Sequence, residues 1–155
     1  MAPTRCYRRC VQRATAVVVA VMLFACTDLR DFRTTWEGPR VGDAPPIRLG
    51  ADASSTARLA IEDIDLHGLR AELTVPGLVT AATLESLPGA EADALSGMTF
   101  TGSPVRVYLG FVAATDGGGD ALAIVALYDD RRVELRVLRG GTAPIYAIFS
   151  LAEAS

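Results

Sequence analysis

Residues 104–151 read PVRVYLGFVAATDGGGDALAIVALYDDRRVELRVLRGGTAPIYAIFSL, and this stretch decides the fold. Apolar residues stand at every second position over 105–111 and again over 133–137. A period of two residues is typical of a strand, because successive side chains of a strand point to opposite faces. The stretch therefore predicts four successive strands, over 105–111, 121–128, 133–137 and 145–151.

Short links join these four strands. They are Asp116–Asp120 (DGGGD), Asp129-Asp130 and Gly140-Gly141, all built from residue types that favour turns. A link of two to five residues reverses the chain but cannot carry it across to a parallel neighbour. We therefore expect an antiparallel meander, in which each strand pairs with the one before it.

The chain upstream predicts further strands over 34–38, 47–49, 57–66, 69–75 and 78–84. The first is expected to end at Gly38-Pro39. In the third, the alternation slips by one residue at Glu62-Asp63, which predicts a β-bulge. His67-Gly68 then forms a hairpin link to the next strand.

Residues 88–95 are the one place after Cys26 that favours a helix, because proline and acidic residues suit a first helical turn. The remaining segments give about eight strands. The fold class is therefore all-β, an antiparallel meander that closes into a small barrel or sandwich.

Residues 5–26 carry the features of an export signal. Four arginines precede the 12-residue apolar run Ala14–Ala25, and Cys26 ends it. A basic start, a short apolar middle and a small residue before the processing point are the parts of a secretory signal. As a helix this run spans about 18 Å, short of the ~30 Å hydrocarbon core of a bilayer. We therefore expect an N-terminal signal helix rather than a permanent transmembrane helix.

The sequence Leu23-Phe24-Ala25-Cys26 resembles the lipobox of bacterial lipoproteins. This resemblance implies that the Cys26 thiolate takes a diacylglyceryl group, that cleavage falls after Ala25 and that the new amino terminus is acylated. More than one acyl chain is enough for stable anchoring. The chain then divides into a signal peptide (1–25), a lipidated tether (26–33) and a single β-rich domain (34–155). The alternative is an ordinary secreted protein.

Residues near the lipobox also bear on location. Aspartate directly after the cysteine tends to retain Gram-negative lipoproteins in the inner membrane, and Thr27 stands at that position here. The resemblance therefore implies a lipid-anchored protein of the outer membrane. The sequence Tyr7-Arg8-Arg9-Cys10-Val11 resembles a twin-arginine signal, so export in the folded state is an alternative route.

Composition limits the partners of the domain. All 18 acidic residues follow Cys26, against 11 arginines there, so the mature part carries a formal charge of −7. An acidic surface argues against nucleic acid, since binding to phosphates requires basic residues. Cys6 and Cys10 leave with the signal and Cys26 is consumed by lipid. No disulfide is therefore expected, although the compartment permits one.

Signs of catalysis or of cofactor binding are few. His67, the only histidine, shares a strand face with Asp63 and Asp65, so a general base or a metal ligand is conceivable there. However, His67 precedes a turn glycine, and no hydrolase, phosphate-loop or dinucleotide motif occurs. The DGGGD link lacks the spaced acids of a calcium-binding EF-hand. We therefore expect no enzyme, cofactor or metal.

Two hypotheses on function remain. The first is a membrane-anchored, non-enzymatic lipoprotein that acts by contact with other envelope components, such as a protein partner. The second is a lipocalin-like barrel that binds a small apolar ligand, with Trp36 and Phe111 as walls of the cavity. Lipocalins and avidin-like barrels also place a tryptophan on their first strand. A packed interior favours the first hypothesis and a hollow one the second.

Overall fold

The computed structural model describes residues 28–42, 56–88, 100, 102–115, 117–141 and 144–155. One short 3-10 helix, η1, precedes eight strands. The elements are η1 (Leu29–Phe32), β1 (Thr35–Gly42), β2 (Thr56–Ile64), β3 (Leu69–Val75), β4 (Val79–Pro88), β5 (Arg106–Ala113), β6 (Asp120–Leu127), β7 (Val133–Arg139) and β8 (Ile145–Glu153).

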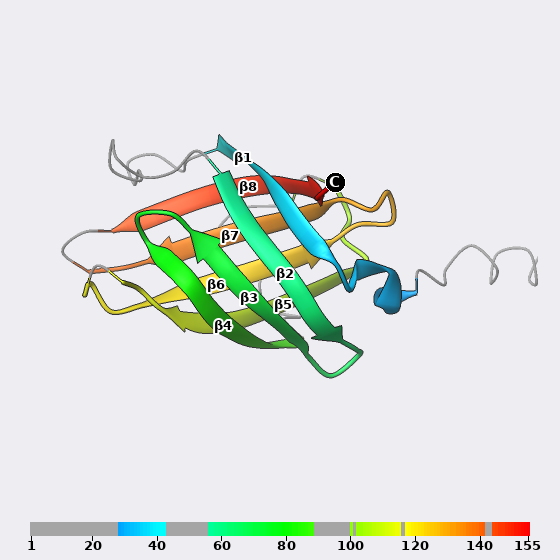
Figure 1. Ribbon diagram of the computed structural model, residues 1–155, viewed down its shortest axis with the longest axis horizontal. Coiled ribbons are helices and arrows are strands. Elements are labelled where there is room, and N and C mark those ends of the chain that lie inside the picture. Colours follow the sequence, from blue (N-terminus) through cyan, green and yellow to red (C-terminus); the bar gives the residue numbers. More distant parts are fainter. Residues whose placement is uncertain (1–27, 43–55, 89–99, 101, 116, 142–143) are drawn as a thin grey trace, which may run out of the picture.

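The eight strands form one closed antiparallel barrel, in which each strand pairs with the next and β8 pairs with β1 (Figure 1). The all-β antiparallel meander of eight strands is confirmed, and it closes as a barrel rather than as a sandwich. The predicted signal helix, Cys26, the strand over 47–49 and residues 89–95 of the predicted helix lie outside the described residues.

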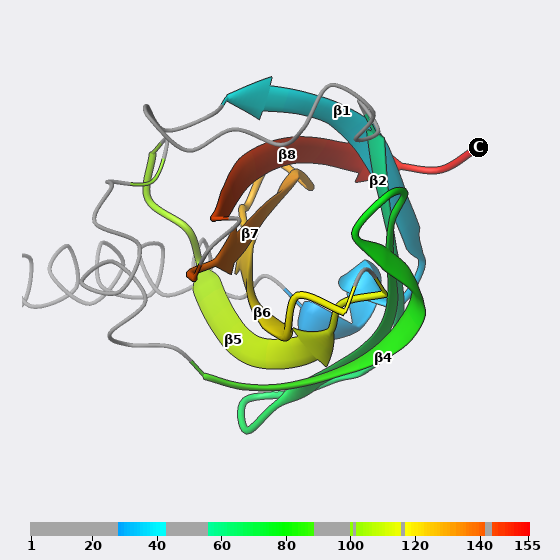
Figure 2. The same ribbon diagram turned by 90° about the vertical axis from the view of Figure 1, so that its left-hand side faces the viewer.

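The barrel has two distinct ends. At one end, called here the η1 end, lie η1 and the links 65–68 and 128–132. Figure 2 shows η1 lying across the opening at this end. The opposite end carries the links 76–78 and 114–119. There, the backbone N–H and the hydroxyl of Thr115 donate to the carbonyl of the fully buried Leu78, at 2.9 and 3.2 Å.

The first strand is longer than predicted. It continues through Gly38-Pro39 to Gly42, because it has a partner on each side, β2 and β8. Gly38 lets the β8 backbone come close, since a methyl group there would overlap the carbonyl oxygen of Ser150. Glycine and proline therefore do not end this strand, although both residue types are typical of breaks.

The predicted β-bulge is confirmed. The pairing of β2 with β3 shifts register between Ile61 and Asp63, so β2 ends at Ile64 and the link to β3 is the four residues 65–68. A second irregularity lies in β4, where Ala81 has φ 46° and its N–H donates to Thr74 Oγ1 at 3.2 Å. This local twist explains why the segment 78–84 shows no clear period.

The folded domain begins before Thr34, within the segment expected to be a tether. Residues 29–32 form η1, capped by the side chain of Asp28, which accepts from the N–H of Arg30 at 3.0 Å. Phe32 is 1% exposed and stacks on Trp36, with ring centroids 5.5 Å apart. An aromatic ring that packs on the core ties this segment to the barrel.

We expect Gly38→Ala to lower the free energy of unfolding by about 1–3 kcal/mol, because the new methyl group forces β1 and β8 apart. Urea unfolding followed by circular dichroism measures this. Gly140→Ala is the matched control, because a methyl group at Gly140 meets nothing within 4 Å, and it should change stability by less than about 0.5 kcal/mol. Equal effects of the two changes would contradict the close approach at Gly38.

Candidate functional site

The interior of the barrel is filled. Its large side chains are less than 2% exposed: Phe32, Trp36, Leu59, Leu73, Leu78, Leu84, Tyr108, Leu127, Leu135 and Phe149. A cavity that holds water would leave accessible surface on the side chains around it. Among the described residues, the interior therefore packs as a core and does not form a ligand cavity.

Trp36, one of the two residues expected to line a cavity, is fully buried in this core. Its indole N–H donates to the carbonyl of Phe32 at 3.0 Å, so its polar atom is satisfied within the η1 end. Tyr108 is also fully buried, and its hydroxyl donates to the carbonyl of Asp65 at 2.6 Å. Burial is the main cause that raises the pKa of Tyr108.

Phe111 does not line the interior, so its expected place as a cavity wall is wrong. It points outward from β5 and is 65% exposed, whereas Tyr108, Gly110 and Val112 point inward. Gly110 stands inside because a side chain there would overlap the carbonyl oxygen of Glu85. The outer face of this strand therefore carries the alternating residues Val107, Leu109 and Phe111.

Instead, an apolar surface lies on the outside of β4 and β5. We call Leu87, Val107, Leu109 and Phe111 the β5 stripe. Leu87 pairs with Leu109 across the two strands, and Leu87 is 68% exposed. The outer positions of β5 end with Ala113 and include no charged residue. Large apolar side chains side by side on a surface are typical of a contact site.

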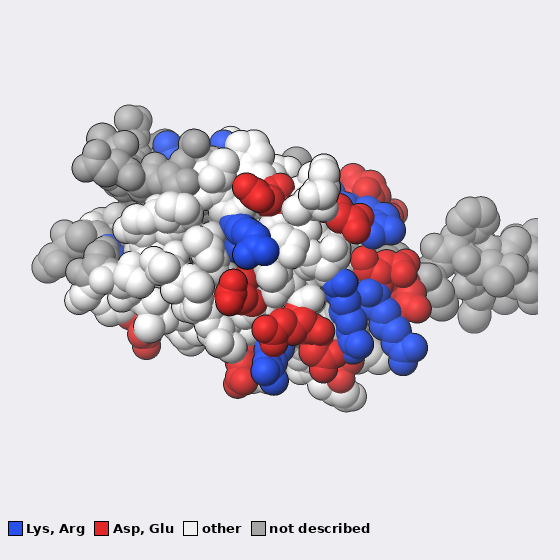
Figure 3. All heavy atoms as spheres, viewed as in Figure 1, with Lys and Arg blue, Asp and Glu red and all other residues white. Residues whose placement is uncertain are grey.

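The opposite wall of the barrel has a different surface. Charged side chains project from β1, β2 and β3, including the pairs Arg58–Glu72 (3.7 Å) and Arg70–Glu62 (3.1 Å). Figure 3 shows these charges over β1 to β3 and towards the η1 end. The barrel thus has a charged wall over β1 to β3 and an apolar stripe over β4 and β5.

Unlike the stripe, part of the outer face of β6 and β7 is buried. Ile124 and Ala126 point outward from β6 and are 0% exposed, which fits the continuous apolar run of this strand. Next to them on β7, Arg136 (1% exposed) and Glu134 (3% exposed) form an ion pair, with Nε 2.6 Å from Oε1. Sequence reasoning missed this pair, because alternating charges on a strand usually face water.

Aromatic side chains surround this buried ion pair. The guanidinium of Arg136 lies over the ring of Phe100, 4.1 Å from its centroid, and the hydroxyl of Tyr128 donates to Glu134 Oε2 at 3.2 Å. Burial, helped by the negative charge of Glu134, raises the pKa of Tyr128 to about 12. The ion pair therefore lies in an environment of low polarity, where its hydrogen bonds hold the neighbouring side chains in place.

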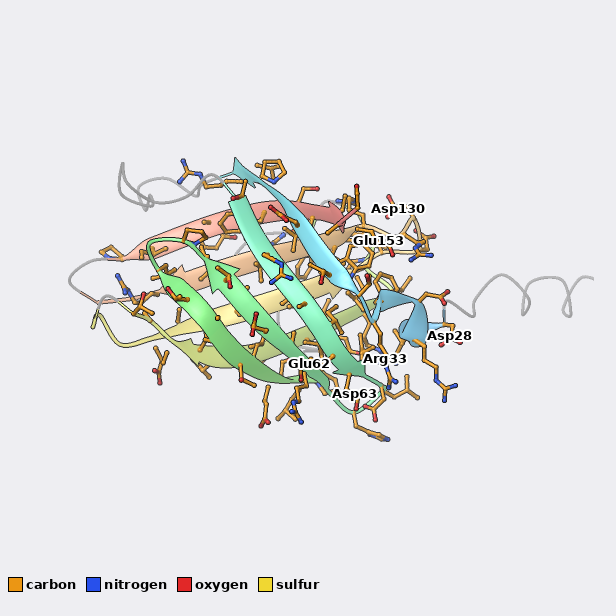
Figure 4. All side chains as sticks on the ribbon, in the orientation of Figure 1. Asp28, Arg33, Glu62, Asp63, Asp130 and Glu153 are labelled. Atoms are coloured by element: carbon orange, nitrogen blue, oxygen red, sulfur yellow. The ribbon has the colours of Figure 1, made fainter. Side chains whose placement is uncertain are left out.

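An open pocket of about 520 Å³ lies beside the β2–β3 link at the η1 end. Its lining includes Asp63, Asp65, His67, Glu85 and Leu87. Asp63 pairs with Arg33, and Figure 4 shows these two labelled side chains at the same end of the barrel. The pocket brings together His67 and the two aspartates named with it in the sequence, but Asp63 pairs with Arg33 and Asp65 binds the backbone of its own link.

Asp65 is bound to the backbone of its own link. Its Oδ1 accepts from the N–H groups of His67 and Gly68 at 2.7 and 2.9 Å. These two bonds hold the pKa of Asp65 below its ordinary value of 3.8. A carboxylate used in this way stabilises the hairpin as a charged group.

The lowered pKa of Asp65 predicts a contribution to acid stability. Because the folded pKa is the lower one, the ionised carboxylate stabilises the fold above pH 3.8, and this contribution is lost as the pH falls through the folded pKa. We therefore expect stability to fall more steeply below pH 4 in the wild type than in Asp65→Asn. Urea midpoints measured from pH 6 to pH 2 test this, and parallel curves would contradict it.

The described residues include no group of three or more His, Cys, Asp or Glu side chains that could hold a metal ion. Within the same part of the chain, no helix is both long and apolar enough to cross a membrane. Comparisons with protein families, curated proteins and solved structures found no match to this chain.

Proposed function

We propose that this protein is a lipid-anchored protein of a Gram-negative cell envelope, held at the outer membrane through Cys26, and that its barrel acts by surface contact. One observation carries the proposal. The barrel buries its apolar side chains in a filled interior and yet exposes further large ones on its outer wall, in the β5 stripe. A protein that carries a ligand inside needs the reverse arrangement.

The anchor is supported by the arginines, the apolar run and the Leu23-Phe24-Ala25-Cys26 sequence that precede the domain. The folded part begins directly after this segment, at Leu29. An acylated Cys26 would thus attach the domain to the membrane without any change to the barrel. Because the mature chain is acidic, anionic lipid head groups repel it. The acyl chains and the uncharged surfaces of the domain are then the parts that attach to the membrane.

Labelling with a radioactive fatty acid tests the anchor. Wild-type protein should incorporate the label and sediment with membranes, whereas Cys26→Ser should do neither, because the acceptor thiol is gone. Cys10→Ser is the matched control, since Cys10 leaves with the signal peptide, and it should behave like the wild type. Label on Cys26→Ser, or none on the wild type, would remove the anchor from the proposal.

A second candidate is the lipocalin-like binder of a small apolar ligand, and the closed eight-stranded barrel favours it. Trp36 is the only tryptophan, so its fluorescence reports on the interior. A saturable change on titration with a fatty acid supports this candidate, and an unchanged spectrum excludes it for that ligand.

A further inference from the structure

We propose that the acylated protein lies on its side on the bilayer, with the β5 stripe in contact with the lipid head groups and the first carbons of the acyl chains. This inference rests on the proposed anchor at Cys26. The partner of the β5 stripe is then the surface of the membrane to which the protein is anchored.

The length of the tether carries the first step. Cys26 and Leu29 are three residues apart, and a chain advances at most about 3.6 Å per residue. The lipidated residue thus stays within about 11 Å of Leu29. Because Phe32 of η1 stacks on Trp36, this short tether holds the η1 end of the barrel close to the membrane surface.

The exit point of the tether carries the second step. η1 lies at the end of the barrel where β1 begins, and it packs beside β2. The carbonyl of Asp31 accepts from Arg131 of the β6–β7 link at 3.2 Å, and Arg131 also pairs with Glu153 at 2.9 Å. The tether therefore leaves the barrel at the η1 end, so the membrane lies against this end or against a wall that adjoins it.

The chemistry of the two walls carries the third step. The wall of β1 to β3 carries charged pairs, so its contact with lipid would require their desolvation. The β5 stripe exposes leucine, valine and phenylalanine without a charge on the outer face of β5. The charged neighbour is Glu85 of β4, whose side chain borders the pocket at the η1 end. An apolar face of this kind settles about 5–10 Å into the boundary between head groups and acyl chains.

Single cysteines test the orientation, because the sequence contains no cysteine after Cys26 and acylation consumes that thiol. The full acylated protein is reconstituted in vesicles of phosphatidylethanolamine and phosphatidylglycerol. An environment-sensitive fluorophore is attached at Ala113→Cys on the outer face of β5, at Glu37→Cys on the outer face of β1, or at Leu66→Cys at the η1 end. Each of these positions is exposed.

We expect the probe at Ala113→Cys to shift to the blue and to be quenched by nitroxide lipids. The probe at Glu37→Cys should instead be quenched by iodide in the water. In the Ala113→Cys background, the further change Phe111→Asp should abolish the lipid contact while acylation persists. Because Phe111 is 65% exposed, this change leaves the core intact, and circular dichroism verifies the fold.

Two results would overturn the inference. Lipid quenching strongest at Leu66→Cys would mean that the barrel stands on its η1 end, and quenching at none of the three positions would mean that the stripe stays in water. The mass of each preparation reports its acylation. A negative result with fully acylated protein therefore counts against the side-on contact alone, whereas absent acyl chains count against the anchor.

Discussion

Replacing Arg136 with methionine should lower the free energy of unfolding by about 3–5 kcal/mol, because it leaves Glu134 buried and negatively charged without its partner. Both residues are at most 3% exposed, and Nε of Arg136 lies 2.6 Å from Oε1 of Glu134. The change also removes the cation from the ring of Phe100. Urea unfolding followed by circular dichroism at neutral pH measures the loss.

A double change separates the ion pair from simple packing. Glu134→Met together with Arg136→Met should recover most of the lost stability, because apolar residues of similar size replace both charges. Arg58→Met is the surface control. Arg58 pairs with the exposed Glu72 at 3.7 Å, so its loss should cost less than about 1 kcal/mol. A double variant as unstable as Arg136→Met would show that charge compensation is not the cause.

The second large effect is expected for Trp36→Ala, which should lower the free energy of unfolding by about 3–5 kcal/mol. The indole is 0% exposed and stacks on Phe32, and its N–H bond to the carbonyl of Phe32 holds η1 on the barrel. The change therefore opens a cavity and frees η1. Thermal unfolding followed by circular dichroism measures the loss without need of the tryptophan signal.

Trp36→Phe distinguishes the contribution of volume from that of the indole N–H. It keeps an aromatic ring against Phe32 but loses the hydrogen bond, so the loss should be smaller than that of Trp36→Ala. Proteolysis near Arg30 should rise in Trp36→Ala, because η1 no longer packs on its partner. A loss below about 1 kcal/mol in Trp36→Ala would contradict the role of this residue as the core of the η1 end.

The strands of the barrel were predictable from local sequence patterns that have simple physical causes. Alternating apolar residues over 133–137, together with the turn residues between strands, predicted the meander. The slip of this alternation at Glu62-Asp63 predicted the bulge, because the side chains of a strand repeat every two residues. These features depend on neighbours along the chain. The strand count then predicted a barrel or a sandwich, because about eight antiparallel strands leave edges that must be paired or covered. The choice of a closed barrel comes from the structure.

The surfaces were harder to predict, because they depend on which neighbours each wall meets. Val107, Leu109 and Phe111 share one face as predicted, but the pattern cannot say which face is inner when both faces carry apolar residues. The burial of Glu134 and Arg136 could not be predicted from the sequence for a similar reason. This burial depends on Phe100 and Tyr128, which come from other parts of the chain. The run over 121–128, apolar on both faces, was the one sequence signal of a covered outer wall.

The return of β8 to β1 also limits how this protein associates with others. An open sheet exposes a row of free backbone donors and acceptors, onto which a second chain adds as a further strand, either in recognition or in the growth of aggregates. Each described strand has a partner strand on both sides, but β4 and β5 share only the pairs Leu87–Leu109 and Pro88–Tyr108. The addition of a further strand therefore requires a seam of the barrel to open, and the β4–β5 seam has the fewest paired residues.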